Sequence, residues 1–330
     1  MSLRIAIIGA GLGGLATALA LQKFGFRATV YERAPVFAPL GAGLTMCSNA
    51  NRVLRHLGLT EILARDGVTQ EQQYRDSRSG AVLRSFDRAN DIRKYGAPYY
   101  KIHRGELQTE MARLVAKNDD QAIRLGAPLV GIRQEGEVVN MKFAGGHTAT
   151  ADLVIGADGI KSMVRDSLFD AAPPVFTGYV AWRALVPTAG LSEDYLVSAL
   201  TAGTNKMINR YLVSAGKLIN VVCFARKTGW QVDDWSTKSD LDEILEEFGD
   251  FDPNTMDTLR LINANEVYKW ALHTRLPQEH WVSGRVALLG DAIHPMLPFM
   301  GQGAAMAIED GMILARCLSA MPRFEEAFAT

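Results

Sequence analysis

The stretch Gly9-Ala10-Gly11-Leu12-Gly13-Gly14 decides the fold of this chain. Gly9, Gly11 and Gly14 match the pattern G-x-G-x-x-G, in which the first glycine allows a tight turn, the second lets the backbone approach a pyrophosphate and the third lets a helix pack closely on a strand. The N–H groups and positive dipole end of the following helix would then face the phosphates. The pattern alone is weak evidence, so its flanking residues must be considered with it.

These flanking residues supply the context that the pattern requires. Arg4 to Ile8 is a short apolar run that predicts a buried parallel strand, and Gly25 is placed to end a helix spanning about Gly13 to Phe24. A second strand, Arg27 to Glu32, completes a βαβ unit. The carboxylate of Glu32 at its end can accept hydrogen bonds from ribose hydroxyls and would repel a 2′-phosphate. This favours FAD or NAD over NADP.

Two later segments have the character of the first strand. Asp152 to Ile155 and Arg285 to Leu289 are apolar runs that each stop at a glycine, with an aspartate just beyond. Ligands of open α/β sheets bind at the carboxyl ends of the strands, so both aspartates are candidate binding residues. The first of them, Asp158 in Gly156-Ala157-Asp158-Gly159, either binds sugar hydroxyls or caps the helix that follows.

The other aspartate belongs to a longer segment. It begins Leu289-Gly290-Asp291-Ala292, and after Pro298 it reaches Gly301-Gln302-Gly303-Ala304. Asp291 is placed to hold a polyol hydroxyl. The residues from Gly301 to Ala304 open an apolar helix, and their N–H groups would sit against a carbonyl that becomes negative on reduction. The N1–C2=O2 edge of a flavin is such a group.

The residues from about 174 to 265 have a different sequence pattern, in which polar and apolar residues alternate. Tyr179 to Val186 and Leu218 to Ala225 predict antiparallel strands, and Ser239 to Phe248 predicts an amphipathic acidic helix. We expect an α/β protein in which a Rossmann-like (βαβ) FAD-binding domain holds an inserted antiparallel-sheet substrate domain. The predicted boundaries are 1–70, 99–173 and 275–330 for the FAD-binding domain, and 71–98 and 174–274 for the substrate domain.

The composition of the 330 residues narrows the class of function. The chain is 48% hydrophobic and 22% charged with a net charge of −1, which gives no indication of a nucleic-acid or membrane partner. No apolar run approaches the ~20 residues that span a bilayer. Cys47, Cys223 and Cys317 are far apart and form no C-x-x-C, and their odd number argues against a disulfide scaffold. We expect a cytoplasmic protein, monomeric or homodimeric, without a metal site.

These motifs, in this order, resemble the FAD-dependent aromatic hydroxylases of the p-hydroxybenzoate hydroxylase superfamily, the group A flavoprotein monooxygenases. The resemblance covers essentially the whole chain, and the nearest branch is similar to the salicylate hydroxylases and 6-hydroxynicotinate 3-monooxygenases. The other stretches that carry it are Leu40-Gly41-Ala42-Gly43-Leu44, Ile102-His103-Arg104-Gly105-Glu106-Leu107, Gly178-Tyr179-Val180-Ala181-Trp182-Arg183 and Ala304-Ala305-Met306-Ala307-Ile308-Glu309-Asp310.

The resemblance implies where the cofactor binds. The first glycine motif and Glu32 would hold the ADP half of FAD, and Arg33 belongs to the same predicted set. The other predicted contacts are Arg104 and Gln108 with the phosphate and ribityl region, Asp291 with the ribityl or pyrophosphate side, and Gly301, Gly303 and Ala304 with the isoalloxazine. Asp158 is tied in the family to both FAD and NAD(P)H. No second dinucleotide fold is visible, so NADH or NADPH would bind transiently.

The resemblance also implies the reaction. NAD(P)H would reduce FAD, the reduced flavin would react with O2 to give a C4a-hydroperoxide, and that species would hydroxylate a small phenolic or hydroxypyridine ring, expected to be carboxylated. The pocket must exclude water, because the hydroperoxide otherwise decays to hydrogen peroxide. A base or a phenolate-stabilising group is expected, because deprotonation makes the substrate ring more nucleophilic.

The substrate side departs from these relatives. Where they often carry His before Tyr-Pro-Val, this chain has Arg210 before Tyr211, and Thr45 stands where the 6-hydroxynicotinate enzymes carry a His. Arg210 either pairs with a substrate carboxylate in a bidentate fork or forms a surface or inter-strand ion pair. Tyr211 is either a hydrogen-bond donor in the pocket or a strand aromatic. Arg210, Tyr211 and Pro298 form the predicted catalytic set.

Some alternatives stay open. The chain could be a flavin oxidase or dehydrogenase acting on a non-aromatic small molecule, or a non-enzymatic relative of the GDP-dissociation inhibitors, which share the flavoprotein fold. An NAD-dependent dehydrogenase would leave Gly290-Asp291 without a purpose. His103 is expected to pack near Arg104, and His294 to have a structural role beside the flavin loop. Relatives usually continue for several dozen residues beyond the position of Thr330, so either the chain is truncated or its C-terminal closure is unusual.

Overall fold

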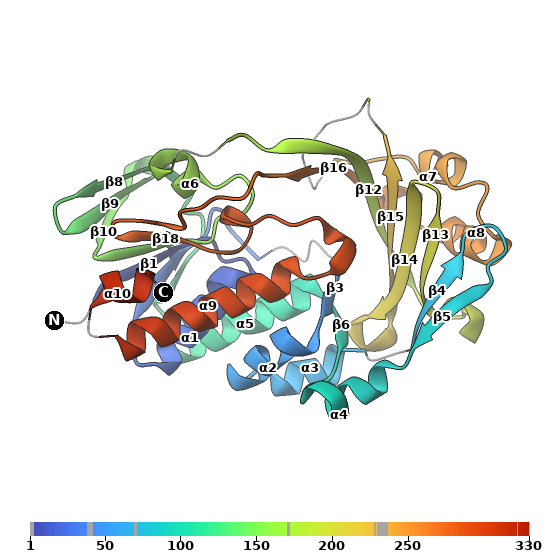
Figure 1. Ribbon diagram of the computed structural model, residues 1–330, viewed down its shortest axis with the longest axis horizontal. Coiled ribbons are helices and arrows are strands. Elements are labelled where there is room, and N and C mark those ends of the chain that lie inside the picture. The colour runs from blue at the N-terminus through green and yellow to red at the C-terminus, as the bar shows by residue number, and fades with distance from the viewer. Residues whose placement is uncertain are drawn as a thin grey trace.

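The computed structural model describes residues 3–37, 42–68, 71–169, 172–227, 229, 237–321 and 323–329. It consists of two units, each built on a large sheet, which lie side by side along the long axis of the molecule (Figure 1). Leu40 and Gly41, the first two residues of one stretch that carries the family resemblance, lie outside the described residues.

The first unit is built on a six-stranded sheet with the order β17-β18-β11-β1-β2-β7. Its strands are β1 (Ile5–Ile8), β2 (Ala28–Tyr31), β7 (Ile123–Arg124), β11 (Leu153–Gly156), β17 (Val282–Ser283) and β18 (Val286–Leu288). All neighbouring strands are parallel except β17 and β18. The four strands predicted around the glycine motifs are confirmed, and they are adjacent in the sheet, so their carboxyl ends lie along one edge.

Both faces of this sheet are covered, which explains its continuous apolar strands. Ile5 and Ile7 of β1 face a core shared with helices, whereas Ala6 and Ile8 face a core shared with a three-stranded sheet. The helices are α1 (Leu12–Lys23), α5 (Arg104–Asn118) and α9 (Gly303–Ala320), which lie side by side (Figure 1). The small sheet consists of β8 (Leu129–Glu135), β9 (Val138–Phe143) and β10 (Thr148–Ala151).

The second unit is built on a seven-stranded sheet with the order β16-β12-β15-β14-β13-β4-β5. Its strands are β4 (Gln72–Asp76), β5 (Val82–Phe86), β12 (Val175–Pro187), β13 (Ser198–Gly203), β14 (Lys206–Val213), β15 (Leu218–Arg226) and β16 (Tyr268–Thr274). All neighbouring pairs are antiparallel except β4 and β13, which are parallel. This parallel pair differs from the expected antiparallel sheet because β4 comes from a separate, earlier segment of the chain.

The two faces of the seven-stranded sheet have different neighbours. The outer face packs against α7 (Leu241–Glu247) and α8 (Pro253–Arg260), and these elements share one core. The inner face is turned toward the first unit, where β3 (Gly43–Met46) pairs antiparallel with β6 (Tyr100–His103). The remaining helices are α2 (Ser48–His56), α3 (Thr60–Asp66), α4 (Asp91–Tyr95), α6 (Met163–Leu168) and α10 (Phe324–Ala329). None of the described helices has the length and apolar character needed to cross a membrane.

Candidate active site

The three glycines of the first motif lie at the carboxyl end of β1, and each has its own steric environment. Gly9 has a φ of 104°, and a Cβ there would lie 2.5 Å from the carbonyl oxygen of Ala157. A Cβ at Gly14 would lie 2.0 Å from the carbonyl oxygen of Gly9, whereas a Cβ at Gly11 would meet nothing within 4 Å. The loop is therefore closed against the protein at Gly9 and Gly14 and open at Gly11. No side chain caps α1, so its first N–H groups can bind an anion.

Two predicted cofactor residues hold this loop from both sides. Glu32 Oε2 accepts a hydrogen bond from Ala10 N at 2.7 Å, and Glu32 Oε1 accepts one from Ala34 N at 2.9 Å. Gln108 Nε2 donates to the carbonyl oxygen of Ala10 at 2.7 Å. A carboxylate offers about four acceptor positions, so Glu32 keeps the capacity to accept from ribose hydroxyls. The side chain of Arg33, which follows, is exposed.

Arg104 and Asp291 lie close enough for their charges to interact, at the carboxyl ends of the strands of the six-stranded sheet. Arg104 begins α5, where burial lowers its pKa while the charges of Asp291 and Glu32 oppose that shift. Asp291 is accessible to solvent but surrounded by protein, and these surroundings raise its pKa against the opposing charges of His294 and Arg104. The predicted Glu32, Arg104 and Asp291 thus form one charged group at the carboxyl ends of the strands.

Asp158 has a different set of partners. Its Oδ1 accepts from Ser162 Oγ at 2.5 Å and its Oδ2 from Val164 N at 3.1 Å, and burial raises its pKa. Both oxygens therefore serve the N-terminus of α6, which is the helix-capping alternative. Arg165 Nη1 of the same helix donates to the carbonyl oxygen of Ala292 at 2.9 Å, so the second motif also holds the Asp291 segment in place.

The turn before α9 reaches toward the second unit. It contains the short helix η7 (Pro298–Met300), after which Gly301 adopts a left-handed φ of 63°. A Cβ at Gly301 would lie 3.1 Å from the Cβ of Thr45 in β3. Gly303 and Ala304 are the first residues of α9, which also lacks a side-chain cap, and a Cβ at Gly303 would lie 3.8 Å from Asp291 Oδ1. The uncapped end of α9 is therefore next to the Asp291 carboxylate.

His294 is paired with Asp310 of α9, as expected for a residue with a structural role. Its Nε2 lies 2.6 Å from Asp310 Oδ2, and the same oxygen accepts from Gly290 N at 2.9 Å. Burial acts to lower the pKa of His294, but the hydrogen bond and charge of Asp310 outweigh it, so the pKa is raised. The pair fixes the start of the Asp291 segment to α9.

Arg210 and Tyr211 point to opposite faces of the seven-stranded sheet, because successive side chains of a strand alternate. Arg210 is 2% exposed on the outer face, where its guanidinium donates to Thr258 Oγ1 and, at 2.6 Å, to Asn254 Oδ1 of α8. Burial lowers its pKa to about 10. Tyr211 is on the inner face, and a Cβ at Gly43 would lie 2.6 Å from its Cε2. The two cannot line one pocket, and Arg210 has the environment of a structural residue.

The strand registers arrange the inner face in rows. The first row contains Gln72, Ser198, Tyr211 and Asn220; the second Leu200, Asn209, Val222 and Arg183; the third Ala202, Met207, Phe224, Ala181 and Trp270. The first unit touches the first row, where Gly43 N donates to Asn220 Oδ1 at 2.7 Å. It also touches the third, where the Phe299 ring lies 5.4 Å from that of Phe224.

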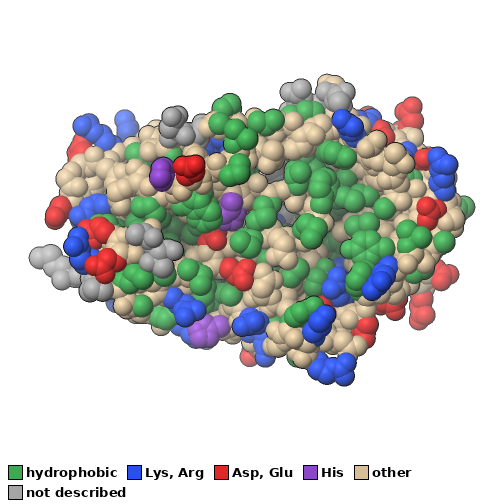
Figure 2. Space-filling model, viewed as in Figure 1, with side chains coloured by type: hydrophobic (Ala, Val, Ile, Leu, Met, Phe, Trp, Pro, Cys, Tyr) green, Lys and Arg blue, Asp and Glu red, His purple; other side chains and the backbone are tan. Residues whose placement is uncertain are grey.

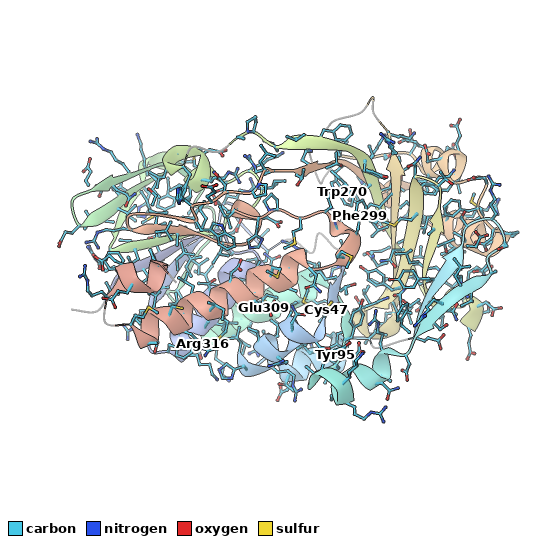
Figure 3. The ribbon with its side chains drawn as sticks, viewed as in Figure 1. Cys47, Tyr95, Trp270, Phe299, Glu309 and Arg316 are labelled. Atoms are coloured by element: carbon cyan, nitrogen blue, oxygen red, sulfur yellow. The ribbon has the colours of Figure 1, made fainter. Side chains whose placement is uncertain are left out.

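The second row lies between these two contacts. Asn209 Oδ1 is buried there without a hydrogen-bond partner among the described residues, so it can accept a further hydrogen bond. Figure 3 shows Phe299 at the junction of the units, and Figure 2 shows hydrophobic side chains gathered over it. Pro298 is exposed at the start of η7. The same parity that places Tyr211 on the inner face would have identified Asn209 from the sequence.

Within the described ranges no group of His, Cys, Asp or Glu side chains could hold a metal ion. The residues gathered at the carboxyl edge instead suit a dinucleotide. The uncapped helix ends, the open position at Gly11 and the accessible Asp291 carboxylate offer donors to phosphates and acceptors to sugar hydroxyls.

Comparisons with known proteins agree with this geometry. Residues 2–325 match the family model described as FAD binding domain. The chain is 38% identical over 322 residues to 6-hydroxynicotinate 3-monooxygenase of Pseudomonas fluorescens, covering 96% of this chain and 82% of the relative. Its structure is similar to a salicylate hydroxylase substrate complex, with a TM-score of 0.80, 30% identity and coverage of 97% of this chain and 80% of that one. It is also similar to Klebsiella pneumoniae HpxO complexed with FAD and uric acid, with a TM-score of 0.88, 27% identity and coverage of 99% and 82%. The chain therefore belongs to the FAD-binding family of aromatic monooxygenases, as its motifs predicted.

Proposed function

We propose that this monooxygenase hydroxylates a small aromatic acid or hydroxypyridine in the space between Gly301 and the second row of the inner face. FAD would lie along the carboxyl edge of the six-stranded sheet, with its ADP half at the glycine loop and Glu32. The compounds in the names of its relatives, 6-hydroxynicotinate and salicylate, support this substrate class.

The observation that carries the proposal is that two separate contacts hold the units together on either side of the second row. Gly43 meets the first row of the inner face, Phe299 meets the third, and Gly301 lies against Thr45 in the strand that begins at Gly43. The turn that leads into α9 is thus brought against the seven-stranded sheet, which we call the substrate sheet. A flavin edge at that turn and a ring on the sheet would be neighbours.

Bound FAD would supply the redox chemistry, taking electrons from NADH or NADPH and activating O2 for transfer of one oxygen atom to the ring. The chain would bind and orient the substrate and exclude water. The rings of Phe224, Trp270 and Phe299 provide the apolar wall. Burial raises the pKa of Tyr211, so its hydroxyl stays neutral and can donate, while Asn209 Oδ1 can accept from a substrate hydroxyl or ring N–H.

The test is turnover by the purified, FAD-loaded protein with hydroxylated aromatic acids and hydroxypyridines. NADH and NADPH consumption and hydrogen peroxide would be followed together. We expect one compound to accelerate consumption with little peroxide. Consumption that ends entirely as peroxide with every compound would favour a flavin oxidase instead.

A further inference from the structure

A buried lysine lies against the first row of the inner face. Lys101 is in β6, directly opposite Thr45 of β3, and its side chain is 2% exposed. Its Nζ donates hydrogen bonds to Gln72 Oε1 and Ser198 Oγ, and it lies 4.5 Å from the ring centroid of Tyr211. All three partners belong to the first row of the inner face. The ammonium is therefore held against the substrate sheet by a strand of the FAD-binding unit.

This ammonium has no counter-charge in the described part of the chain. Its hydrogen-bond acceptors are neutral, and none of the described carboxylates forms an ion pair with it. The charged group that acts on it is Arg88, which has the same sign and is paired with Asp91 at 3.4 Å. An unpaired buried charge is costly, so it indicates a site where a ligand supplies the opposite charge.

We propose that Lys101 binds the carboxylate of the aromatic substrate. The inference rests on the proposed function and names a chemical feature of its substrate. Lys101 lies against Tyr211 on the inner side of the sheet, whereas Arg210, the residue expected from the sequence to bind a carboxylate, points to the outer side, where it donates to α8. Arg183, another cation of the inner face, lies over the rings of Tyr268 and Trp270.

The surroundings of Lys101 give this role a dependence on pH. Burial and the charge of Arg88 lower the pKa of Lys101 to about 7. Lys101 contacts the ring of Tyr211, whose pKa is raised. Two residues away along the chain are Tyr99, whose pKa is raised to about 12, and His103, whose pKa is lowered. The two tyrosines stay neutral near pH 7. Above that pH Lys101 would need to take up a proton to pair with a carboxylate, so binding should weaken about tenfold per pH unit.

The experiment compares ligands that differ only in charge. FAD-loaded protein is titrated with three acids, salicylate, 3-hydroxybenzoate and 6-hydroxynicotinate, and with the amide of each, and binding is read from the flavin absorbance change. The proteins are the wild type, Lys101→Met, Lys101→Arg and the control Lys206→Met. Lys206 is on β14 but on the outer face, where it pairs with Asp250. Flavin content and thermal unfolding confirm that each variant is folded.

We expect the wild type to prefer at least one acid over its amide, and Lys101→Met to lose about tenfold to a hundredfold in acid affinity with little change for the amide. Lys101→Arg should keep the preference and lose the pH dependence, because an arginine stays protonated. Lys206→Met should match the wild type. An unchanged acid preference in Lys101→Met would overturn the role of Lys101 and leave the hydroxylase function intact. A wild type that binds no acid better than its amide would overturn it as well, and turnover of a neutral ring would then still support the hydroxylase.

Discussion

The two sheets meet at one junction, but they present polar groups to it in different ways. At the carboxyl edge of the six-stranded sheet, the groups are backbone N–H donors of helix ends and carboxylates fixed by nearby amides, such as Glu32 on Ala10 and Ala34. On the inner face of the seven-stranded sheet, they are side chains from separate strands, such as Asn209 and Ser198, with Lys101 of β6 packed against them. The first arrangement suits a dinucleotide cofactor such as FAD. The second can change with the substrate while the sheet is kept.

The largest effect should come from substitutions on the two faces of the substrate sheet, with a loss of stability on the outer face and a loss of ligand affinity on the inner face. Arg210→Ala removes a buried guanidinium and leaves Asn254 and Thr258 without it, so the free energy of unfolding should fall by about 2–4 kcal/mol. Ligand affinity of the folded, FAD-loaded variant should stay within about twofold. Tyr211→Phe should have the opposite pattern: ligand affinity should fall, because the hydroxyl donor is removed, and stability should change little. Denaturant unfolding and flavin titration measure both, and an Arg210→Ala protein of normal stability with a raised KM would place Arg210 in the pocket.

A smaller effect should come from the glycine loop, where Gly14 is needed for packing and Gly11 for the approach of the cofactor. A Cβ at Gly14 would collide with the Gly9 carbonyl, so Gly14→Ala should destabilise the FAD-free protein by about 1–3 kcal/mol. Gly11→Ala meets no protein atom and should leave that stability within about 0.5 kcal/mol. It should still weaken FAD binding, because the methyl group would occupy the side open to the pyrophosphate. Equal flavin affinity in Gly11→Ala and the wild type would argue against this position for the pyrophosphate.

Loss of a carboxylate at the carboxyl edge should affect flavin retention. Glu32→Ala and Asp291→Ala should each weaken FAD binding by about tenfold or more, because each removes charged hydrogen-bond acceptors. Asp152→Ala is the control, since Asp152 pairs with Arg4 at the opposite end of the sheet. Flavin content after purification and equilibrium dialysis would be compared. If Glu32→Ala and Asp291→Ala both keep full flavin, the assigned orientation of the cofactor is wrong.

The smallest effect should come from acid on the outer side of the substrate sheet. Burial acts to raise the pKa of Glu243 in α7, but hydrogen bonds from Lys269, Ser239 and Trp182 outweigh it and lower the pKa to about 2. A carboxylate with a lowered pKa contributes stability above its ordinary pKa, and that contribution is lost as the pH falls toward the folded value. Between about pH 4.5 and 2 the wild type should lose under about 1 kcal/mol that Glu243→Gln does not lose. Urea unfolding across this range would compare them, and parallel curves would exclude the effect.

The glycine loop could be predicted from the sequence because its contacts are local. Gly9, Gly11 and Gly14 belong to one loop, and Glu32 reaches Ala10 from the end of the next strand, whereas Arg104 and Asp291 join this edge from distant segments. Asp158 shows the limit of such reasoning. Its two oxygens bind Ser162 and Val164, and nothing in the sequence distinguishes this cap from a ligand contact.

The inner face could be predicted only in part because it depends on long-range pairing. The segment that contains Arg210 and Tyr211 was recognisable, and alternation along the strand already implied that the two point apart. Lys101 could not be recognised, because its partners come from β4, β13 and β14. The parallel pairing of β4 with β13 brings Gln72 beside Ser198, and no local pattern predicts that pairing.

The most direct test of the proposed activity is the fate of oxygen. The FAD-loaded protein would be supplied with NADH or NADPH, 18O2 and the compound that best accelerates nicotinamide oxidation, and the product would be analysed by mass spectrometry. We expect a ring-hydroxylated product that carries one 18O atom. Hydrogen peroxide equal to the nicotinamide consumed, with no labelled product, would contradict the assignment as an aromatic hydroxylase.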